Sequence, residues 1–252
     1  MDWVETFYSK QNEWFGVYLG PVEETHHKRA WLIQELAELK GICQVLELGA
    51  GGGQTTYAVA NLGHYATMVE LLPDSAAHAV ELADSLGQGR MEVVLGDFYK
   101  VDFEQKFDCV YYFDSFGIGS DEDQRRLLKR IADWLKPEGA AIIEVGATWY
   151  WGGIANGKSM DLGGGMRAYS FDPIESRLID RWWLPENPEE VYHQSLRCYT
   201  PADLHLLLEG TGLELVQIQA GGKVDYEEME FIESAPLEEA MTYYIKLRKS
   251  NK

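Results

Sequence analysis

A run of apolar residues that ends in three alternating glycines is the feature that most limits the folds open to this chain. Residues 45–56 are VLELGAGGGQTT, in which Val45, Leu46 and Leu48 predict a buried strand. Glycines at 49, 51 and 53 permit positive φ and leave the turn without side chains, so that a ligand can approach the main chain closely. A strand that turns into a helix in this way is typical of the ligand-binding edge of a parallel α/β sheet.

The spacing of the glycines separates two kinds of cofactor. A dinucleotide-binding turn has the pattern G-x-G-x-x-G, but here Gln54 occupies the third glycine position. The pattern E-x-G-x-G-x-G over 47–53 instead resembles the first motif of the class I S-adenosylmethionine-dependent methyltransferases. In that family the turn lies against the methionine part of the cofactor. An NAD-dependent oxidoreductase and a non-catalytic module that only binds S-adenosylmethionine remain as alternatives.

Acidic residues follow the next predicted strands. Glu70 ends the strand over 65–69, about 20 residues after the turn, where a carboxylate can accept hydrogen bonds from both ribose hydroxyls. The strand over 91–95 leads to Asp97 and Phe98, which the resemblance places around the adenine. The strand over 107–113 ends at Asp114, similar to the family's fourth motif, and residues 135–139 resemble the turn before its fifth strand. The resemblance implies S-adenosyl-L-methionine as cofactor, bound by Glu47, Gly49, Ala50, Gly51, Gly53, Glu70, Leu71, Asp97, Phe98, Asp114 and Ser115.

The order of helical and strand-like segments predicts one α/β domain over 1–252. We expect a helical cap over 1–40, a cofactor-binding core over 41–147 of alternating strands and helices, a lid insertion over 148–199, and a helix with two strands over 200–252. This order predicts a doubly wound, Rossmann-like, mostly parallel sheet, and the resemblance implies seven strands of which the last is antiparallel. Thr200 and Pro201 predict the start of the late helix. Residues 221–239 are acidic and rich in turn formers, so we expect a solvated excursion there.

The insertion is unusually aromatic, and its alternating residues predict a small antiparallel sheet over the carboxyl edge of the main sheet. We expect the substrate to contact Trp149, Trp151, Tyr169 and Trp183 of the insertion, with Trp14 and Tyr18 from the N-terminal segment. His193 is the candidate general base, because an unperturbed histidine has a pKa of about 6.5. The alternatives are that these aromatic residues only attach the insertion to the core, and that His193 lies on its outer face.

Charge and composition limit the classes of partner that we expect for this protein. A formal net charge of −19 disfavours nucleic acid, because phosphate binding needs clustered Lys and Arg. The chain has no apolar run near the ~20 residues that span a bilayer and no signal-peptide pattern, so we expect a cytoplasmic protein with no membrane partner. Three cysteines without C-x-x-C spacing and a single His-His pair predict no metal site. We therefore expect methyl transfer to nitrogen or oxygen of a small molecule, neutral or cationic rather than anionic; the oligomeric state stays open.

Overall fold

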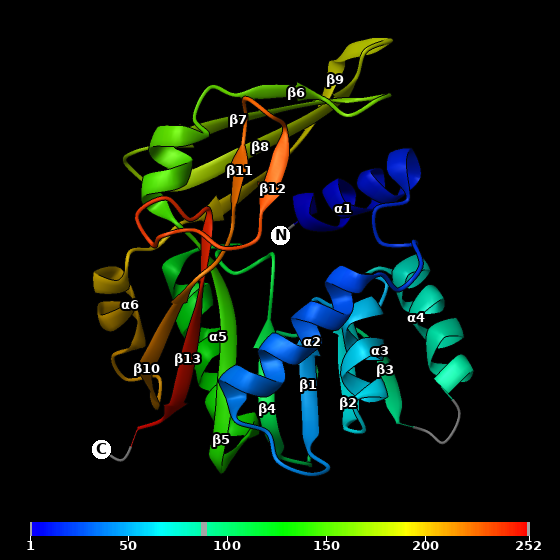
Figure 1. Ribbon diagram of the computed structural model, residues 1–252, viewed down its shortest axis with the longest axis vertical. Helices are drawn as coiled ribbons and strands as arrows, with labels where there is room; N and C mark the ends of the chain where they lie inside the picture. Colours follow the sequence, from blue (N-terminus) through cyan, green and yellow to red (C-terminus); the bar gives the residue numbers. More distant parts are fainter. Residues whose placement is uncertain (1, 87–89, 251–252) are drawn as a thin grey trace.

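The computed structural model describes residues 2–86 and 90–250, and it contains a large sheet with a smaller sheet above its carboxyl edge (Figure 1). The large sheet has seven strands in the order β10-β13-β5-β4-β1-β2-β3. β13 is antiparallel to both of its neighbours, and the remaining strands run parallel to one another. The predicted fold class is confirmed. The strands are β1 (Gln44–Leu48), β2 (Tyr65–Glu70), β3 (Met91–Leu95), β4 (Phe107–Tyr112), β5 (Leu135–Gly146), β10 (Leu213–Ala220) and β13 (Thr242–Lys249).

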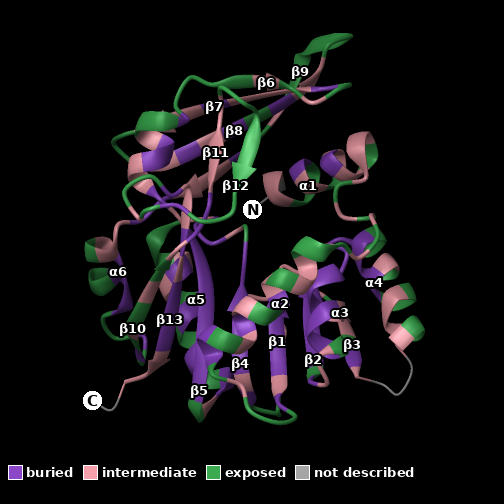
Figure 2. Cartoon of the chain, in the orientation of Figure 1, coloured by how far each residue is buried: buried purple, intermediate pink, exposed green. Residues whose placement is uncertain are grey.

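Helices cover both faces of this sheet, which explains why its central strands are apolar throughout. Along β1, Val45 packs in a cluster on one face and Leu46 in a cluster on the other, and both are fully buried (Figure 2). The first cluster lies under α2 (Glu24–Ala37), α3 (Gln54–Asn61) and α4 (Pro73–Leu86). The second lies under α5 (Asp121–Trp134) and α6 (Pro201–Leu208). The hydrophobic core is thus two layers separated by the sheet.

The insertion forms the predicted antiparallel sheet. It begins with a short π-helix, η1 (Tyr150–Ile154), and continues as β6 (Ser159–Asp161), β7 (Met166–Asp172), β8 (Arg177–Leu184) and β9 (Asn187–Arg197), which pair in that order. The N-terminal helix α1 (Asp2–Phe15) contacts β9 and lies beside this sheet (Figure 1). We refer to η1 and β6–β9 as the lid.

Two segments differ from the sequence-based expectation. Residues 96–106, where the alternation predicted a helix, form a loop that Arg130 of α5 fastens through a hydrogen bond to the Phe98 carbonyl oxygen (3.1 Å). Residues 221–239, expected as a solvated excursion, contain a hairpin of β11 (Lys223–Asp225) and β12 (Glu230–Ile232). The Tyr150 hydroxyl accepts a hydrogen bond from the Val224 amide (3.2 Å), which ties the hairpin to the lid. Within the described residues, no helix is long and apolar enough to cross a membrane.

Candidate active site

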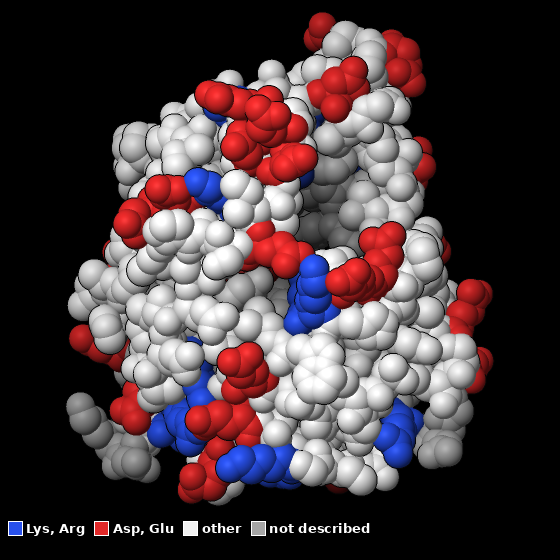
Figure 3. Space-filling view, in the orientation of Figure 1, with Lys and Arg blue, Asp and Glu red and all other residues white. Residues whose placement is uncertain are grey.

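A cavity of about 1090 Å³ lies between the carboxyl ends of the parallel strands and the lid, and it is visible as a hollow in the surface (Figure 3). Pockets for one drug-sized ligand span about 300–1,000 Å³, so this cavity has room for a cofactor and a second small molecule. We call the wall formed by the glycine turn and the ends of β2 and β3 the turn half, and the wall formed by the lid and the ends of β4 and β5 the lid half. Residues predicted to bind the cofactor that line the cavity are Glu47, Gly49, Ala50, Gly51, Glu70, Leu71, Asp97, Phe98, Asp114 and Ser115.

The glycine turn needs its glycines for different reasons. Gly49 and Gly51 have φ of 63° and 56°, and a Cβ on Gly49 would lie 3.3 Å from the Tyr112 ring. The Gly49 amide donates to the Val69 carbonyl oxygen of β2 (2.9 Å), so the turn is held against the sheet. Gly53 does not line the cavity: its Cβ would lie 2.7 Å from that of Ala79 in α4. Gly53, predicted as a cofactor contact, is thus placed where it allows α3 to pack closely against α4.

Glu70 fastens the turn from below. Its Oε2 accepts a hydrogen bond from the Gly51 amide and its Oε1 accepts one from the Leu72 amide, both at 2.8 Å. Burial raises the pKa of this carboxyl, and the backbone donors oppose the rise. A carboxylate offers about four lone-pair sites, so each oxygen keeps capacity for a further donor in the cavity. The side chain fits a ligand that presents two adjacent hydroxyls.

Asp97 and Phe98 offer a polar and a flat contact at the end of β3. The Asp97 Oδ1 accepts from the Tyr99 amide (2.8 Å), and its Oδ2 lies 3.2 Å from the Lys100 ammonium. The Phe98 ring packs edge-on against Tyr112, with centroids 5.4 Å apart. Both residues line the cavity, so this part of the turn half fits a planar group that carries an amino substituent.

The Glu47 carboxylate accepts hydrogen bonds from other side chains of the protein, although it reaches the cavity wall. Its Oε2 accepts hydrogen bonds from the Tyr111 hydroxyl (2.6 Å) and the Thr56 hydroxyl. Burial raises its pKa to about 7, despite these two donors. Glu47 thus joins β1 to β4 and α3 behind the turn.

The N-terminal segment lies directly on the glycine turn, and Gln54 holds it there. The Gln54 side-chain amide donates to the carbonyl oxygens of Tyr18 (3.0 Å) and Gly20 (2.9 Å). A Cβ on Gly52 would lie 1.7 Å from the Tyr18 carbonyl oxygen. In the sequence, Gln54 served only to disfavour a dinucleotide. The glutamine at this position, where the pattern has a glycine, was the sequence feature that could have indicated the contact with the N-terminal segment.

The ceiling of the lid half contains a buried ion pair that sequence analysis missed. Asp180, with 0% of its side chain exposed, binds the Arg167 guanidinium through two hydrogen bonds of 2.9 and 2.8 Å. The Trp182 indole N–H and the Gln194 amide also donate to Asp180, at 3.1 and 2.9 Å. The guanidinium lies 4.7 Å from the centre of the Tyr169 ring, so charge and aromatic surface face the cavity together.

The predicted substrate residues divide into two groups. Tyr18, Trp151 and Tyr169 line the cavity, whereas Trp14, Trp149 and Trp183 are not among its lining residues. The predicted general base, His193, does not line it either. Trp149 instead stacks on Tyr243, with ring centroids 5.7 Å apart, and Trp14 packs against Tyr192 at 5.4 Å. These aromatic side chains join the lid and α1 to their surroundings.

The parity of the lid strands places His193 and Trp183 away from the cavity. Side chains alternate between the two faces of a strand. On β8 the residues that line the cavity include Leu178 and Trp182, so Trp183 belongs to the opposite face. His193 pairs with Arg181 in the neighbouring strand, and both are exposed on that outer face. The structure thus places His193 on the outer face of the lid, the alternative that the sequence had left open.

Asp114 lies at the end of β4 in a conformation that is unusual for a residue other than glycine. Its φ is 64°, and its amide donates to Oε2 of Glu144 at the end of β5 (3.1 Å). Arg29 of α2 binds both carboxylate oxygens of Asp114, at 2.8 and 3.3 Å. Thr242 of β13 donates to the other oxygen of Glu144 (2.8 Å). Four elements therefore meet at the floor of the lid half.

The two carboxyls on this floor have opposite pKa shifts. Burial acts to raise the pKa of Asp114, but the Arg29 guanidinium outweighs it and holds the pKa below its usual range. Burial and the adjacent Asp114 charge raise the pKa of Glu144. Asp114 points into the open cavity, with 62% of its side chain accessible, whereas Glu144 is buried behind it.

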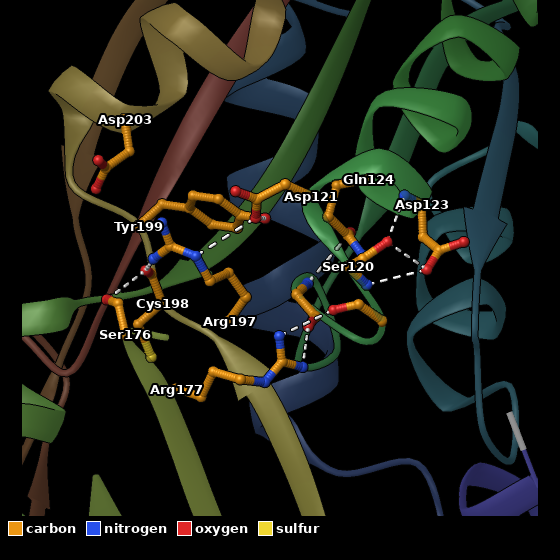
Figure 4. A network of polar contacts seen from close by, with 12 residues as sticks. Ser120, Asp121, Asp123, Gln124, Ser176, Arg177, Arg197, Cys198, Tyr199 and Asp203 are labelled. Atoms are coloured by element: carbon orange, nitrogen blue, oxygen red, sulfur yellow. Dashed lines mark hydrogen bonds and ion pairs between the residues drawn. The ribbon is translucent and has the colours of Figure 1, made fainter. Parts of the chain in front are cut away.

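Hydrogen bonds fasten the lid to the loop between β4 and α5 (Figure 4). Arg177 of β8 donates to the carbonyl oxygens of Gly119 (2.9 Å) and Gly117 (3.3 Å). Arg197 lies 3.4 Å from Asp121, which also accepts from the Tyr199 hydroxyl (2.8 Å). The same loop carries Ser115, whose hydroxyl lies 3.3 Å from the hydroxyl of Tyr8 in α1. The lid is thus built as one unit with the ends of β4 and β5.

Across residues 2–86 and 90–250, no three His, Cys, Asp or Glu side chains converge as a metal site.

Comparison with known proteins agrees with this architecture. A family model described as a methyltransferase domain matches residues 45–139. The CcbJ methyltransferase from Streptomyces caelestis shares the fold with a TM-score of 0.72 and 22% identity over 99% of this chain and 97% of that one. An S-adenosylmethionine-dependent methyltransferase from Clostridium acetobutylicum has a TM-score of 0.69 and 13% identity, and 98% of each chain is covered.

The glycopeptide N-methyltransferase MtfA has a TM-score of 0.60 and 16% identity over 89% of this chain and 90% of its own. A search of curated proteins found no match. The matched segment, 45–139, runs from β1 to the start of β5 and contains the turn half, and the shared fold extends over the lid as well. Residues 45–139 therefore match a methyltransferase domain, and the chain as a whole has the fold of the solved S-adenosylmethionine-dependent methyltransferases to which it is similar.

Proposed function

We propose that this protein transfers a methyl group from S-adenosylmethionine to a nitrogen or oxygen atom of a small molecule held in the lid half of the cavity. The observation that carries the proposal is that one cavity joins the glycine turn and its carboxylates to an aromatic chamber under the lid. An enclosed chamber favours a small acceptor over a polymer. The name of one structural neighbour, a glycopeptide N-methyltransferase, agrees with an acceptor of this kind.

We assign the cofactor to the turn half. The main chain of Gly49, Ala50 and Gly51 would face its methionine part, and Glu70 would accept from its ribose hydroxyls. Asp97 would accept from the adenine amino group, while Phe98 and Leu71 would pack against the ring. Glu47 supports this half from behind through Thr56 and Tyr111.

The bound cofactor supplies a methyl group on a sulfonium, which is already electrophilic. The protein therefore has to align the acceptor atom behind that methyl group and exclude water. The lid and α1 cover the cavity and Tyr8 spans it, since its hydroxyl donates to Gln194 of the lid (3.0 Å) and lies beside Ser115 of the core. These contacts would fix the acceptor's chamber around the reacting atoms.

Calorimetry with S-adenosylhomocysteine tests the proposal. We expect binding to the wild type and at least tenfold weaker binding to Asp97→Asn, because a hydrogen bond to a charged group contributes about 1.5–3 kcal/mol. Asp102→Asn is the matched control, since Asp102 pairs with Arg130 outside the cavity.

Melting curves with NAD and methyl transfer to a broad acceptor panel separate the alternatives. A rise in Tm with NAD but not with S-adenosylhomocysteine would favour an oxidoreductase. Tight binding of S-adenosylhomocysteine without transfer to any panel member would favour a binding module. Transfer to small amines or alcohols supports the proposed function.

A further inference from the structure

The arginines that line the lid half, taken with the carboxyls beside them, leave one carboxyl without a guanidinium partner. Every arginine that lines it is already matched by a carboxylate. Glu144 is an additional carboxyl, and its hydrogen bonds come from the Thr242 hydroxyl and the Asp114 amide, which are neutral groups. Among the described residues that line this wall, an anionic acceptor would find no guanidinium without a carboxylate partner, whereas a cation would find one further carboxyl. The arginine pairs are Arg29 with Asp114, Arg167 with Asp180, and Arg197 with Asp121.

Aromatic rings form an independent second feature of the same wall. Tyr8, Phe116, Trp151 and Tyr169 all line the cavity. Ring faces carry negative potential and attract ammonium groups, by about 0.5–2 kcal/mol for each well-placed ring. Aromatic walls above a carboxylate floor recognise an organic cation, and neither feature favours an anion.

Asp114 is the carboxylate that such a cation can reach. Its side chain projects into the cavity from a left-handed backbone position, which costs about 1–3 kcal/mol in residues other than glycine and is typical of functional sites. Arg29 uses one lone pair on each oxygen, and a carboxylate has about four. Asp114 can therefore accept N–H bonds from a ligand while it stays paired with Arg29.

We propose that the methyl acceptor is an amine, with its nitrogen bound at the Asp114 carboxylate and its carbon skeleton against the rings of the lid half. This inference rests on the proposed function and narrows it to N-methylation. It also moves Asp114 from the cofactor, where the family resemblance placed it, to the acceptor.

The proton of the amine has an acceptor in the same place. An ammonium has no lone pair, so it must give one proton to a carboxylate or water before it reacts. The C–N bond then forms as the C–S bond breaks, the electron pair stays on sulfur, and the methylated ammonium product releases a proton in turn. Glu144, whose pKa is raised by burial, can take up a proton near neutral pH, while Asp114 stays ionised beside Arg29. Asp114 thus binds the nitrogen, and Glu144 takes up the proton.

Binding of matched probes tests the inference without the methyl-transfer reaction. We would saturate the protein with S-adenosylhomocysteine and measure calorimetric affinities for three series with the same alkyl or aryl bodies: amines, alcohols and carboxylates. We expect the amines to bind at least tenfold more tightly than the matching alcohols or carboxylates. Asp114→Asn should abolish this preference while it leaves S-adenosylhomocysteine affinity within about threefold, because asparagine tolerates the left-handed position. Asp102→Asn, which also breaks an arginine pair, should change neither.

The outcomes separate this inference from the proposed function. Absence of S-adenosylhomocysteine binding to the wild type would refute the cofactor assignment itself. If S-adenosylhomocysteine binds but the amine series shows no advantage, including the case in which no series binds, the amine assignment is wrong. A preference for amines that survives Asp114→Asn would also overturn it, because the nitrogen would then be held elsewhere.

Discussion

The buried carboxyl of Glu47 should make the stability of this protein fall as the pH rises. Burial raises its pKa from 4.5 to about 7, so the folded protein holds this proton more tightly than the unfolded chain does. The stabilisation is complete below the unfolded pKa and is lost as the pH rises through about 7. Each tenfold change in proton affinity is worth about 1.4 kcal/mol, so the total is about 3 kcal/mol.

Glu47→Gln removes this dependence while it keeps the shape of the side chain. The Gln carbonyl oxygen can still accept from the Thr56 and Tyr111 hydroxyls, as Glu47 does. At pH 5 the variant and the wild type should unfold with similar free energies, because Glu47 is then protonated. At pH 8 the variant should be more stable by about 3 kcal/mol, which corresponds to roughly 6–12 °C in Tm for a chain of this size.

Urea denaturation of both proteins from pH 5 to pH 8 measures the difference. Other carboxyls titrate in this range, so only the difference between variant and wild type isolates Glu47. Glu92→Gln, on the exposed side of β3, is the control for loss of one acidic group. A difference that stays constant with pH, or that grows in favour of the wild type, would refute the assignment of a raised pKa to this burial.

Three further substitutions test separate parts of the structure. Gly52→Ala should lower Tm by displacing the N-terminal segment, at a cost of about 1–3 kcal/mol. Gly153→Ala is the control and should leave Tm unchanged, because its Cβ meets no atom within 4 Å. Equal melting curves for the two variants would contradict the contact between Gly52 and the N-terminal segment. Arg167→Met should destabilise the protein by about 3–5 kcal/mol, because Asp180 is left buried and unpaired. Adding Asp180→Leu should restore most of the lost free energy of unfolding. If urea denaturation gave the double variant a lower free energy of unfolding than Arg167→Met alone, that result would argue against the pair. His193→Ala should leave methyl-transfer rates within twofold from pH 6 to pH 9, since the side chain is exposed outside the cavity; a tenfold loss would place it in the site.

The turn half was predictable because its chemistry follows from local backbone geometry. An apolar strand followed by glycines determines where the chain turns, and the acids at 70 and 97 come at the ends of strands that parallel pairing brings to the same edge. The structure places Glu70 and Asp97 on the cavity wall as the spacing predicted. Gly53 was the exception, because its constraint comes from packing between α3 and α4 and not from the strand.

The lid half was harder to predict because strand register decides which side chains face the cavity. A one-residue error in parity moves every side chain to the opposite face. Periodicity alone favoured Trp183, whereas the cavity wall contains Trp182. The buried Asp180 resolves the parity afterwards, since its four hydrogen bonds require Arg167, Trp182 and Gln194 on its own face. Of these partners, only Trp182 is close to Asp180 in sequence. Spacing alone could therefore not indicate the network.

The floor of the lid half shows why composition could give only the direction of the charge preference. A net charge of −19 disfavours anionic ligands in general, but it does not say which carboxyls face the cavity. What determines the local preference is pairing: helix α2 contributes Arg29 to Asp114, and β5 contributes Glu144 with hydrogen bonds from neutral donors only. Without Arg29, Asp114 would lose the positive charge that holds its pKa below the usual range. The same arginine therefore keeps Asp114 ionised for binding and leaves Glu144 as the group that can exchange a proton near neutral pH.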